Sequence, residues 1–364
     1  MKNFINKTIL VTGSCGTVGS ELINQLLNES YGIKELIGID NNESELFFQD
    51  QRHLPEKRAN FYVCDIRDHK ALDVRMQGVD VVFHCAALKH VILCERSPDQ
   101  AIETNINGVK NIISSAKKNK VEVVVFTSSD KAVNPTNVMG TTKLMGERLM
   151  TAANSSKRSD GPIYVSTRFG NILGSSGSVV PIFHNQIKSG GPVTITDNRM
   201  TRFVMSVEES VRLVIDSALQ AKGGEVFITK MPVLRILDLA KAMIQELAPI
   251  YGYKPEEIEV ETIGSKPGEK LYEELMSEEE MQRSLELKEY FSVLPAFRGI
   301  YASIDYRYEE LISEELDNPY ISANEKPLST LEAVKTLKDY GLLGSPESDE
   351  GSRYWPGDKE EVGQ

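Results

Sequence analysis

The sequence has few cysteines and no long apolar or basic run, and each of these absences excludes a class of protein. Its four cysteines (Cys15, Cys64, Cys85 and Cys94) form no C-x-x-C pair, so we expect thiols in a reducing cytosol and no metal site. No apolar run approaches the roughly 18 residues of a membrane-spanning helix, and the start MKNFINK lacks a signal-peptide core. We therefore expect a cytoplasmic protein without a membrane span.

The charge balance argues against two kinds of partner. The net charge is −12, and no long basic run offsets it locally. Nucleic acid and anionic membrane surfaces are therefore not expected to bind. A phosphate ligand stays possible, because backbone amides and a few placed cations can bind one locally.

Strands alternate with helices through the first half of the 364 residues. Strands are predicted at Thr8–Thr12, Glu35–Asp40, 61–63, 79–85, 121–126 and Ile163–Arg168, and a helix at 99–118. This alternation predicts a doubly wound parallel α/β sheet with right-handed crossovers. We assign residues 1–168, with segments that return later, to this domain.

The residue pattern of the sequence changes after residue 168. Residues 169–344 are interpreted mainly as a smaller substrate-binding lid, and residues 345–364 as a mobile polar tail. Within the lid we expect short strands at Val193–Ile195 and 259–262, and helices at 208–221, Ile236–Leu247 and 331–340. A charged turn at 266–270 should lead into another helix.

A glycine-rich turn follows the first predicted strand. Gly13, Gly16 and Gly19 have the spacing that lets backbone amides approach a pyrophosphate at a helix N-terminus. Asp40 ends the second strand, where a carboxylate accepts hydrogen bonds from an adenosine ribose and repels a 2′-phosphate. The pattern predicts NAD rather than NADP. The alternative for the glycines is an ordinary strand-to-helix turn, and the alternative for Asp40 is a turn residue at the strand end.

The stretch 127–143 is the candidate active site. It places Ser129, Asp130 and Lys131 side by side after a buried strand, where open α/β sheets hold their ligands. Met139 and Lys143 lie four residues apart, so they share a helix face. The alternative for Asp130 and Lys131 is a plain salt bridge at the strand end.

Further candidate ligands of the substrate come from other loops. Lys89 and His90 follow the fourth strand and either face a substrate or are solvated loop residues. As a cluster, Arg199, Arg202 and the charged turn at 266–270 could hold a nucleotide diphosphate, although a single cation of this kind is more often a surface charge.

Several segments resemble the nucleotide-sugar 4,6-dehydratases acting on UDP-N-acetylglucosamine, which are extended short-chain dehydrogenases/reductases of polysaccharide biosynthesis. They are CAALKHVILCE, ETNINGVKN, SSDKAVNPTN with TTKLMGE, RFGNILGSSGSVVPIF, RMTRFVMSVEE and KPGEKLYEEL. The resemblance implies a Rossmann-type domain, bound NAD, a UDP-sugar substrate and a homo-oligomer, a dimer or larger.

The resemblance also implies which residues form the binding site. Cofactor contacts would come from Gly13, Gly16, Thr17, Val18, Gly19, Asp40, Asp65, Ile66, Ala86, Ala87, Lys89, Asn105 and Lys143, and substrate contacts from Lys89, His90, Asn171, Val180, Arg199, Arg202 and Glu269.

The sequence departs from this pattern at one position. Met139 stands where the YxxxK signature has tyrosine, as in a methionine-bearing subset of the family. A thioether cannot exchange a proton, so acid–base work would shift to Asp130 and Lys131, while Met139 would pack against nicotinamide or sugar.

The resemblance implies a redox-neutral elimination in which hydride leaves C4, water is lost across C5 and C6, and hydride returns to C6. Lys131 would take the C5 proton if its pKa is lowered, and Asp130 would protonate the C6 hydroxyl. Asp130, or Ser129 relaying to it, would accept the C4 hydroxyl proton, and Lys143 would bind the nicotinamide ribose. The alternatives are a nucleotide-sugar epimerase or reductase and a non-catalytic dinucleotide-binding protein.

Overall fold

The computed structural model describes residues 4–28, 31–156, 161–175, 178–264, 268–297 and 304–343. The tail predicted at 345–364 lies outside these ranges, and so does Lys266 of the charged turn. All statements below concern the described residues.

A ten-stranded sheet forms the centre of the molecule. Its order is β15-β13-β14-β10-β6-β5-β4-β1-β2-β3. The parallel part comprises β1 (Thr8–Thr12), β2 (Glu35–Asp40), β3 (Ala59–Val63), β4 (Val81–His84), β5 (Val123–Thr127), β6 (Ile163–Arg168) and β10 (Val226–Thr229). The antiparallel edge comprises β14 (Tyr290–Val293), β13 (Ser284–Leu287) and β15 (Leu311–Ser313). The predicted doubly wound parallel sheet is confirmed, and late segments complete it.

Helices cover both faces of the sheet, because alternate strand side chains point to opposite faces. Ile9 and Val11 pack with α1 (Thr17–Asn28) and α9 (Val207–Gln220), while Leu10 packs with the helices of the other face. The elements named here and below that flank the sheet are α2 (Glu43–His53), α3 (His69–Arg75), α4 (Val91–Arg96), α5 (Pro98–Ile102), α6 (Gly108–Lys118) and α7 (Val138–Ser156).

The helix predicted at 99–118 is interrupted. α5 passes through a π-helical turn at Glu103–Asn107 before α6 begins at Gly108. A π-helical turn adds a residue to the helical repeat and redirects a side chain, often at a functional site. Here it aims Asn105 at the loop that follows β4.

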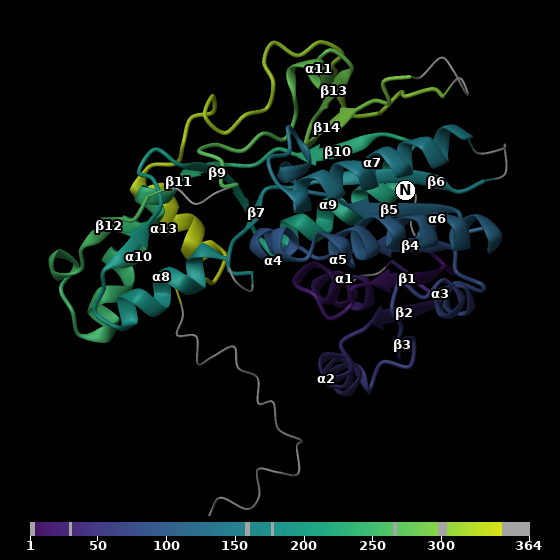
Figure 1. Cartoon of the computed structure of the whole chain (residues 1–364), viewed down its shortest axis with the longest axis horizontal. Coiled ribbons are helices and arrows are strands. Elements are labelled where there is room, and N and C mark those ends of the chain that lie inside the picture. The colour runs from purple at the N-terminus through teal and green to yellow at the C-terminus, as the bar shows by residue number, and fades with distance from the viewer. Residues whose placement is uncertain are drawn as a thin grey trace, which may run out of the picture.

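The smaller lobe has its own core and lies beside the C-terminal ends of the parallel strands (Figure 1). It contains β7 (Asn171–Ile172), α8 (Val179–Lys188), β8 (Val193–Ile195), β9 (Thr201–Met205), β11 (Val233–Arg235), α10 (Ile236–Leu247), β12 (Val260–Thr262) and α13 (Thr330–Asp339). The strand at Val193–Ile195 and the helix at Ile236–Leu247 have the predicted bounds.

The prediction of a helix directly after the charged turn is wrong. Residues 268–277 form no helix, and the short α11 (Glu278–Met281) begins only afterwards. Their backbone groups bond to other segments instead. The amide of Thr201 donates to Leu271 O, and the backbone of Glu273 and Leu275 pairs with residues 320–322. Because tertiary partners satisfy these groups, the segment runs extended beneath the cavity described next.

Candidate active site

A cavity of about 1700 Å³ lies between the sheet and the smaller lobe. It is lined by residues that follow β1, β2, β4, β5 and β6, together with side chains from α8, β9 and residues 268–273. Single ligand pockets commonly measure about 300–1000 Å³. The cavity is therefore large enough for two ligands, such as a dinucleotide and a nucleotide sugar.

The glycine turn is built so that no side chain fits. Gly13 has φ +68°, and a Cβ on it would lie 2.7 Å from the backbone of Ala86. A Cβ on Gly19 would lie 2.1 Å from Gly13 O. Asp40 Oδ2 accepts a hydrogen bond from the amide of Cys15, at 3.1 Å, which holds the carboxylate beside the turn. This cradle fits the pyrophosphate and adenosine ribose of NAD.

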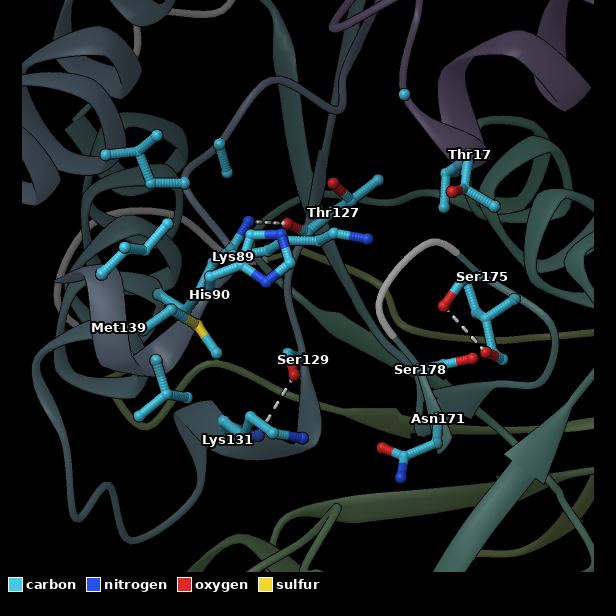
Figure 2. Close-up of a pocket in the computed structure, with 18 of the residues that line it drawn as sticks. Thr17, Lys89, His90, Thr127, Ser129, Lys131, Met139, Asn171, Ser175 and Ser178 are labelled. Carbon is cyan, nitrogen blue, oxygen red and sulfur yellow. Dashed lines mark hydrogen bonds between the residues drawn. The ribbon is translucent and has the colours of Figure 1, made fainter. Parts of the chain in front are cut away.

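Met139 and Lys143 lie on the buried face of α7, as their spacing predicts. Lys143 Nζ donates to the carbonyl of Thr127 at 2.9 Å, and burial lowers the pKa of Lys143 to about 8. Figure 2 shows Met139, Lys89 and His90 on one side of the cavity and Asn171 and Ser178 on the other, with Ser129 and Lys131 between them.

Five polar side chains form the acid–base cluster: Ser129, Asp130, Lys131, Arg202 and Glu273. Ser129 Oγ donates to Asp130 Oδ1 at 2.5 Å, and Lys131 Nζ lies 3.1 Å from both oxygens of Asp130. Lys131 Nζ is also 3.6 Å from Glu273 Oε1, and Arg202 Nε is 3.3 Å from the same oxygen. The salt bridge considered as the alternative for Asp130 and Lys131 is therefore present.

The cluster does not meet the condition for a basic Lys131. Burial by itself would lower the pKa of Lys131, but the carboxylates of Asp130 and Glu273 outweigh it and raise that pKa. Burial would raise the pKa of Asp130, yet Lys131 and Ser129 outweigh it and keep the pKa below its usual range. Burial, together with the neighbouring Asp130, raises the pKa of Glu273 to about 7. In this structure the proton-accepting groups are the carboxyls, and Lys131 is a cation.

Most of the predicted site residues line the cavity. They are Gly13, Gly16, Thr17, Val18, Gly19, Asp40, Asp65, Ile66, Ala86, Ala87, Lys89, His90, Ser129, Lys131, Met139, Lys143, Asn171, Arg202 and Glu269. Burial lowers the pKa of Lys89. Arg202 is already engaged, because its guanidinium donates to the carbonyls of Thr201, Lys270 and Leu271. It holds the segment 268–273 in place as well as facing the cavity.

Four predicted site residues lie elsewhere. Asp130 is 1% exposed, behind Ser129 and Lys131. Asn105 lies behind the loop after β4, where its amide bonds to both backbone groups of Leu88. Val180 is buried in the core of the smaller lobe. Arg199 has a 72% exposed side chain paired with Asp197, because the turn before β9 directs it to solvent.

Glu273 and Ser178 are two of the cavity residues that were not predicted. Glu273 belongs to the segment KPGEKLYEEL and Ser178 to RFGNILGSSGSVVPIF, so the family-like segments contained both. Each has a buried oxygen, Glu273 Oε2 and Ser178 Oγ, with no hydrogen-bond partner among the described residues. A helix had been expected over Glu273, so its side chain could not be placed from the sequence.

The strand order and the glycine turn are those of a Rossmann-type dinucleotide-binding fold, as in the extended short-chain dehydrogenases/reductases. Comparison with known proteins narrows this class. Residues 9–295 match the model of the family described as polysaccharide biosynthesis protein, and the chain belongs to that family.

Three relatives illustrate the likeness. An uncharacterized membrane protein of Methanocaldococcus jannaschii is 49% identical over 290 residues, covering 80% of this chain and 86% of that protein. A UDP-glucose 4-epimerase of Rickettsia canadensis is 39% identical and covers 92% of this chain and 96% of its own length. The crystal structure of Pen from Bacillus thuringiensis is 38% identical with a TM-score of 0.84, covering 94% of this chain and 99% of that one. In the described part of this chain, no helix is both long and apolar enough to cross a membrane.

Proposed function

We propose that the protein is an NAD-dependent 4,6-dehydratase of UDP-N-acetylglucosamine, giving a UDP-4-keto-6-deoxy-N-acetylhexosamine for glycan biosynthesis. The observation that carries the proposal is the Ser129–Asp130–Lys131 cluster at the cavity, beside a helix that presents Met139 instead of a proton-exchanging tyrosine. An elimination needs an acid–base pair in addition to the hydride carrier, and the cluster provides one.

The residues of the chain would divide the work as follows. NAD, when bound, would supply the hydride chemistry for the oxidation at C4 and the reduction at C6. The turn of Gly13, Gly16 and Gly19 with Asp40 would hold its dinucleotide, and Lys143 its nicotinamide ribose. Asn171 and Ser178 on the opposite wall, together with the cavity-lining Glu269, would face the uridine diphosphate.

Proton transfer at the sugar begins at Ser129, because Asp130 itself is buried behind it. Ser129 Oγ would take the C4 hydroxyl proton and pass its own to Asp130. Lys131 Nζ would face C5 and C6 as a cation and would stabilise negative charge that develops there. It becomes a base for the C5 proton only after it has given a proton to Asp130 or Glu273.

The test is to incubate the purified protein with UDP-N-acetylglucosamine and follow the sugar nucleotide by mass spectrometry, with and without added NAD. We expect a product lighter by one water without net consumption of NAD. Asp130→Asn should lower the rate by about 10²–10⁴-fold, the range of general acid–base catalysis. Asp197→Asn, which changes an aspartate of the smaller lobe that pairs with Arg199 and does not line the cavity, is the matched control and should keep wild-type activity. An unchanged sugar nucleotide would refute the proposal.

One observation favours a second candidate function. The relative from Rickettsia canadensis, at 39% identity, is named a UDP-glucose 4-epimerase. An epimerase needs only oxidation and reduction at C4, and its product has the mass of the substrate. Conversion of UDP-N-acetylglucosamine or UDP-glucose to an isomer of equal mass would identify this activity instead.

A further inference from the structure

The acid–base cluster contains a second carboxyl group, that of Glu273, to which the mechanism above gives no role in the oxidation at C4. Glu273 is 3% exposed and comes from the extended segment beneath the cavity, far in sequence from residues 129–131. Both nearby cations approach its Oε1: Lys131 Nζ at 3.6 Å and Arg202 Nε at 3.3 Å. Its Oε2 is buried and has no hydrogen-bond partner among the described residues.

This arrangement suits a carboxyl that exchanges a proton with Asp130. The two carboxyls share one cation, because Lys131 Nζ lies 3.1 Å from both oxygens of Asp130 and 3.6 Å from Glu273 Oε1. Two ionised carboxylates this close to one cation repel each other, which favours the uptake of one proton by the pair. Apart from Asp130, the charged groups that act on Glu273 are Lys131 and Arg202, and both favour its ionised form.

We propose that Glu273 is a positioning residue that ends a proton relay, Ser129 to Asp130 to Glu273, and stores the proton released from the sugar C4 hydroxyl. The relay begins at a cavity-lining hydroxyl, passes through the 2.5 Å Ser129–Asp130 bond and ends at the buried carboxyl. It rests on the proposed function only for the oxidation at C4.

The oxidation step balances as follows. The C4–H bond breaks and its electron pair leaves with the hydride to the nicotinamide, which is reduced. The O–H bond breaks and its electrons form the C4 carbonyl. Its proton goes to Ser129 Oγ, whose own proton goes to Asp130 and is shared with Glu273. The pair then holds one proton, which is available to the C6 hydroxyl when it leaves as water.

The relay provides an acceptor for the C4 hydroxyl proton in a site that has Met139 at the tyrosine position. Neither Met139 nor the cationic Lys131 can accept it. Asp130 alone is a weak acceptor, because its neighbours hold its pKa below the usual range. A second carboxyl with a pKa of about 7 makes the pair able to accept and return a proton near neutral pH.

The experiment compares Glu273→Gln with Glu274→Gln by stopped-flow absorbance of reduced bound nicotinamide after mixing with UDP-N-acetylglucosamine. Glu274 is the matched control, since it is adjacent, pairs with Lys270 at 3.1 Å and does not line the cavity. We expect E273Q to slow nicotinamide reduction by about 10–100-fold, the usual effect of an outer-shell partner, at unchanged affinity for the sugar nucleotide. The rate of nicotinamide reduction by wild type and E274Q should fall as the pH falls through about 7. The rate of E273Q should not show this pH dependence. Glu273→Asp should restore part of the rate and the decrease of the rate at low pH.

A second measurement does not depend on turnover. Infrared difference spectra of the NAD-bound protein across the same pH range should show a protonated carboxyl band that appears as the pH falls through about 7. The band should be present in wild type and E274Q and absent in E273Q. If E273Q folds poorly, the wild-type spectra still test the relay, because the carboxyl band of wild type either titrates near pH 7 or does not.

The outcomes separate the two proposals. Nicotinamide reduction without loss of water refutes the dehydratase but leaves the relay supported if E273Q behaves as expected. Loss of water by wild type, with E273Q equal to E274Q in rate and pH profile, refutes the relay alone. Absence of the titrating band refutes the relay as well, and absence of any nicotinamide reduction in wild type refutes both.

Discussion

At the scale of single residues, the two lysines of the site differ in their surroundings. Lys131 lies between Asp130 and Glu273, whose charges raise its pKa over the opposing effect of burial. Lys143 is buried on α7 and bonds to the neutral carbonyl of Thr127, and burial lowers its pKa to about 8. The same residue type is therefore a cation in the resting site at one position and a group with a pKa of about 8 at the other.

The lowered pKa of Lys143 predicts a pH-dependent stability. Its folded pKa of about 8 lies below the usual value of about 10.4, so between these pH values the unfolded chain binds more protons. Stability linked to Lys143 should therefore increase as the pH rises through this window, by up to about 3 kcal/mol. Lys143→Met lacks this gain, so urea unfolding should show wild type improving relative to the variant between about pH 7 and about pH 10.

Lys241→Met, at an exposed position of α10, is the control for this series. Its difference from wild type should stay constant across the same pH range. Parallel pH curves for K143M and wild type would contradict the assignment of a lowered pKa to Lys143.

At the scale of elements, one buried ion cluster connects the sheet to the segment that carries Glu273. Arg168 ends β6, and its guanidinium bonds to Glu147 of α7, to Glu280 of α11 and to the carbonyl of Leu275. These contacts hold residues 273–280 against the end of the parallel sheet. They explain how a non-helical segment keeps a carboxyl fixed beside residues 129–131.

Removing the cation of this cluster should be costly. Arg168→Leu leaves Glu147 and Glu280 buried without their partner, and breaking such a pair costs about 3–5 kcal/mol. Chemical denaturation should show this loss in the midpoint of unfolding. Arg199→Leu, at the exposed ion pair with Asp197, should leave the midpoint nearly unchanged. Equal midpoints for the two variants would show that the Arg168 cluster contributes little.

At the scale of the whole molecule, apolar side chains are exposed on two helices that pack against each other. Ile102 of α5 is 42% exposed and Met145 of α7 is 46% exposed. Exposed apolar surface of this kind favours association between chains. This placement suggests where the dimer or larger assembly expected from the sequence would form.

Met145→Glu tests this surface. Light scattering after size-exclusion chromatography should give a dimer or larger for wild type and a monomer for M145E, because a charge would be buried in the contact. Leu331→Glu changes a residue that is 76% exposed on α13, in the smaller lobe, and should keep the wild-type assembly. A wild-type monomer, or an M145E protein that still assembles, would refute the assignment.

The sequence by itself determined those features that depend on neighbours along the chain. The strands at Thr8–Thr12, Glu35–Asp40 and Ile163–Arg168 have the predicted bounds, because their β-branched and apolar runs are continuous and buried. The glycine turn and the common helix face of Met139 and Lys143 follow from spacing alone.

Only the tertiary structure decided which charged groups meet. Glu273 reaches Lys131 because backbone bonds to β9 and to residues 320–322 replace a helix, and no local pattern encodes those partners. The same long-range contacts leave Arg199 in solvent while they bury Arg202 three residues later. Burial and charge neighbours then set the protonation of Lys131 and Glu273, since desolvation and Coulomb energy depend on distances in space, which spacing along the chain does not determine.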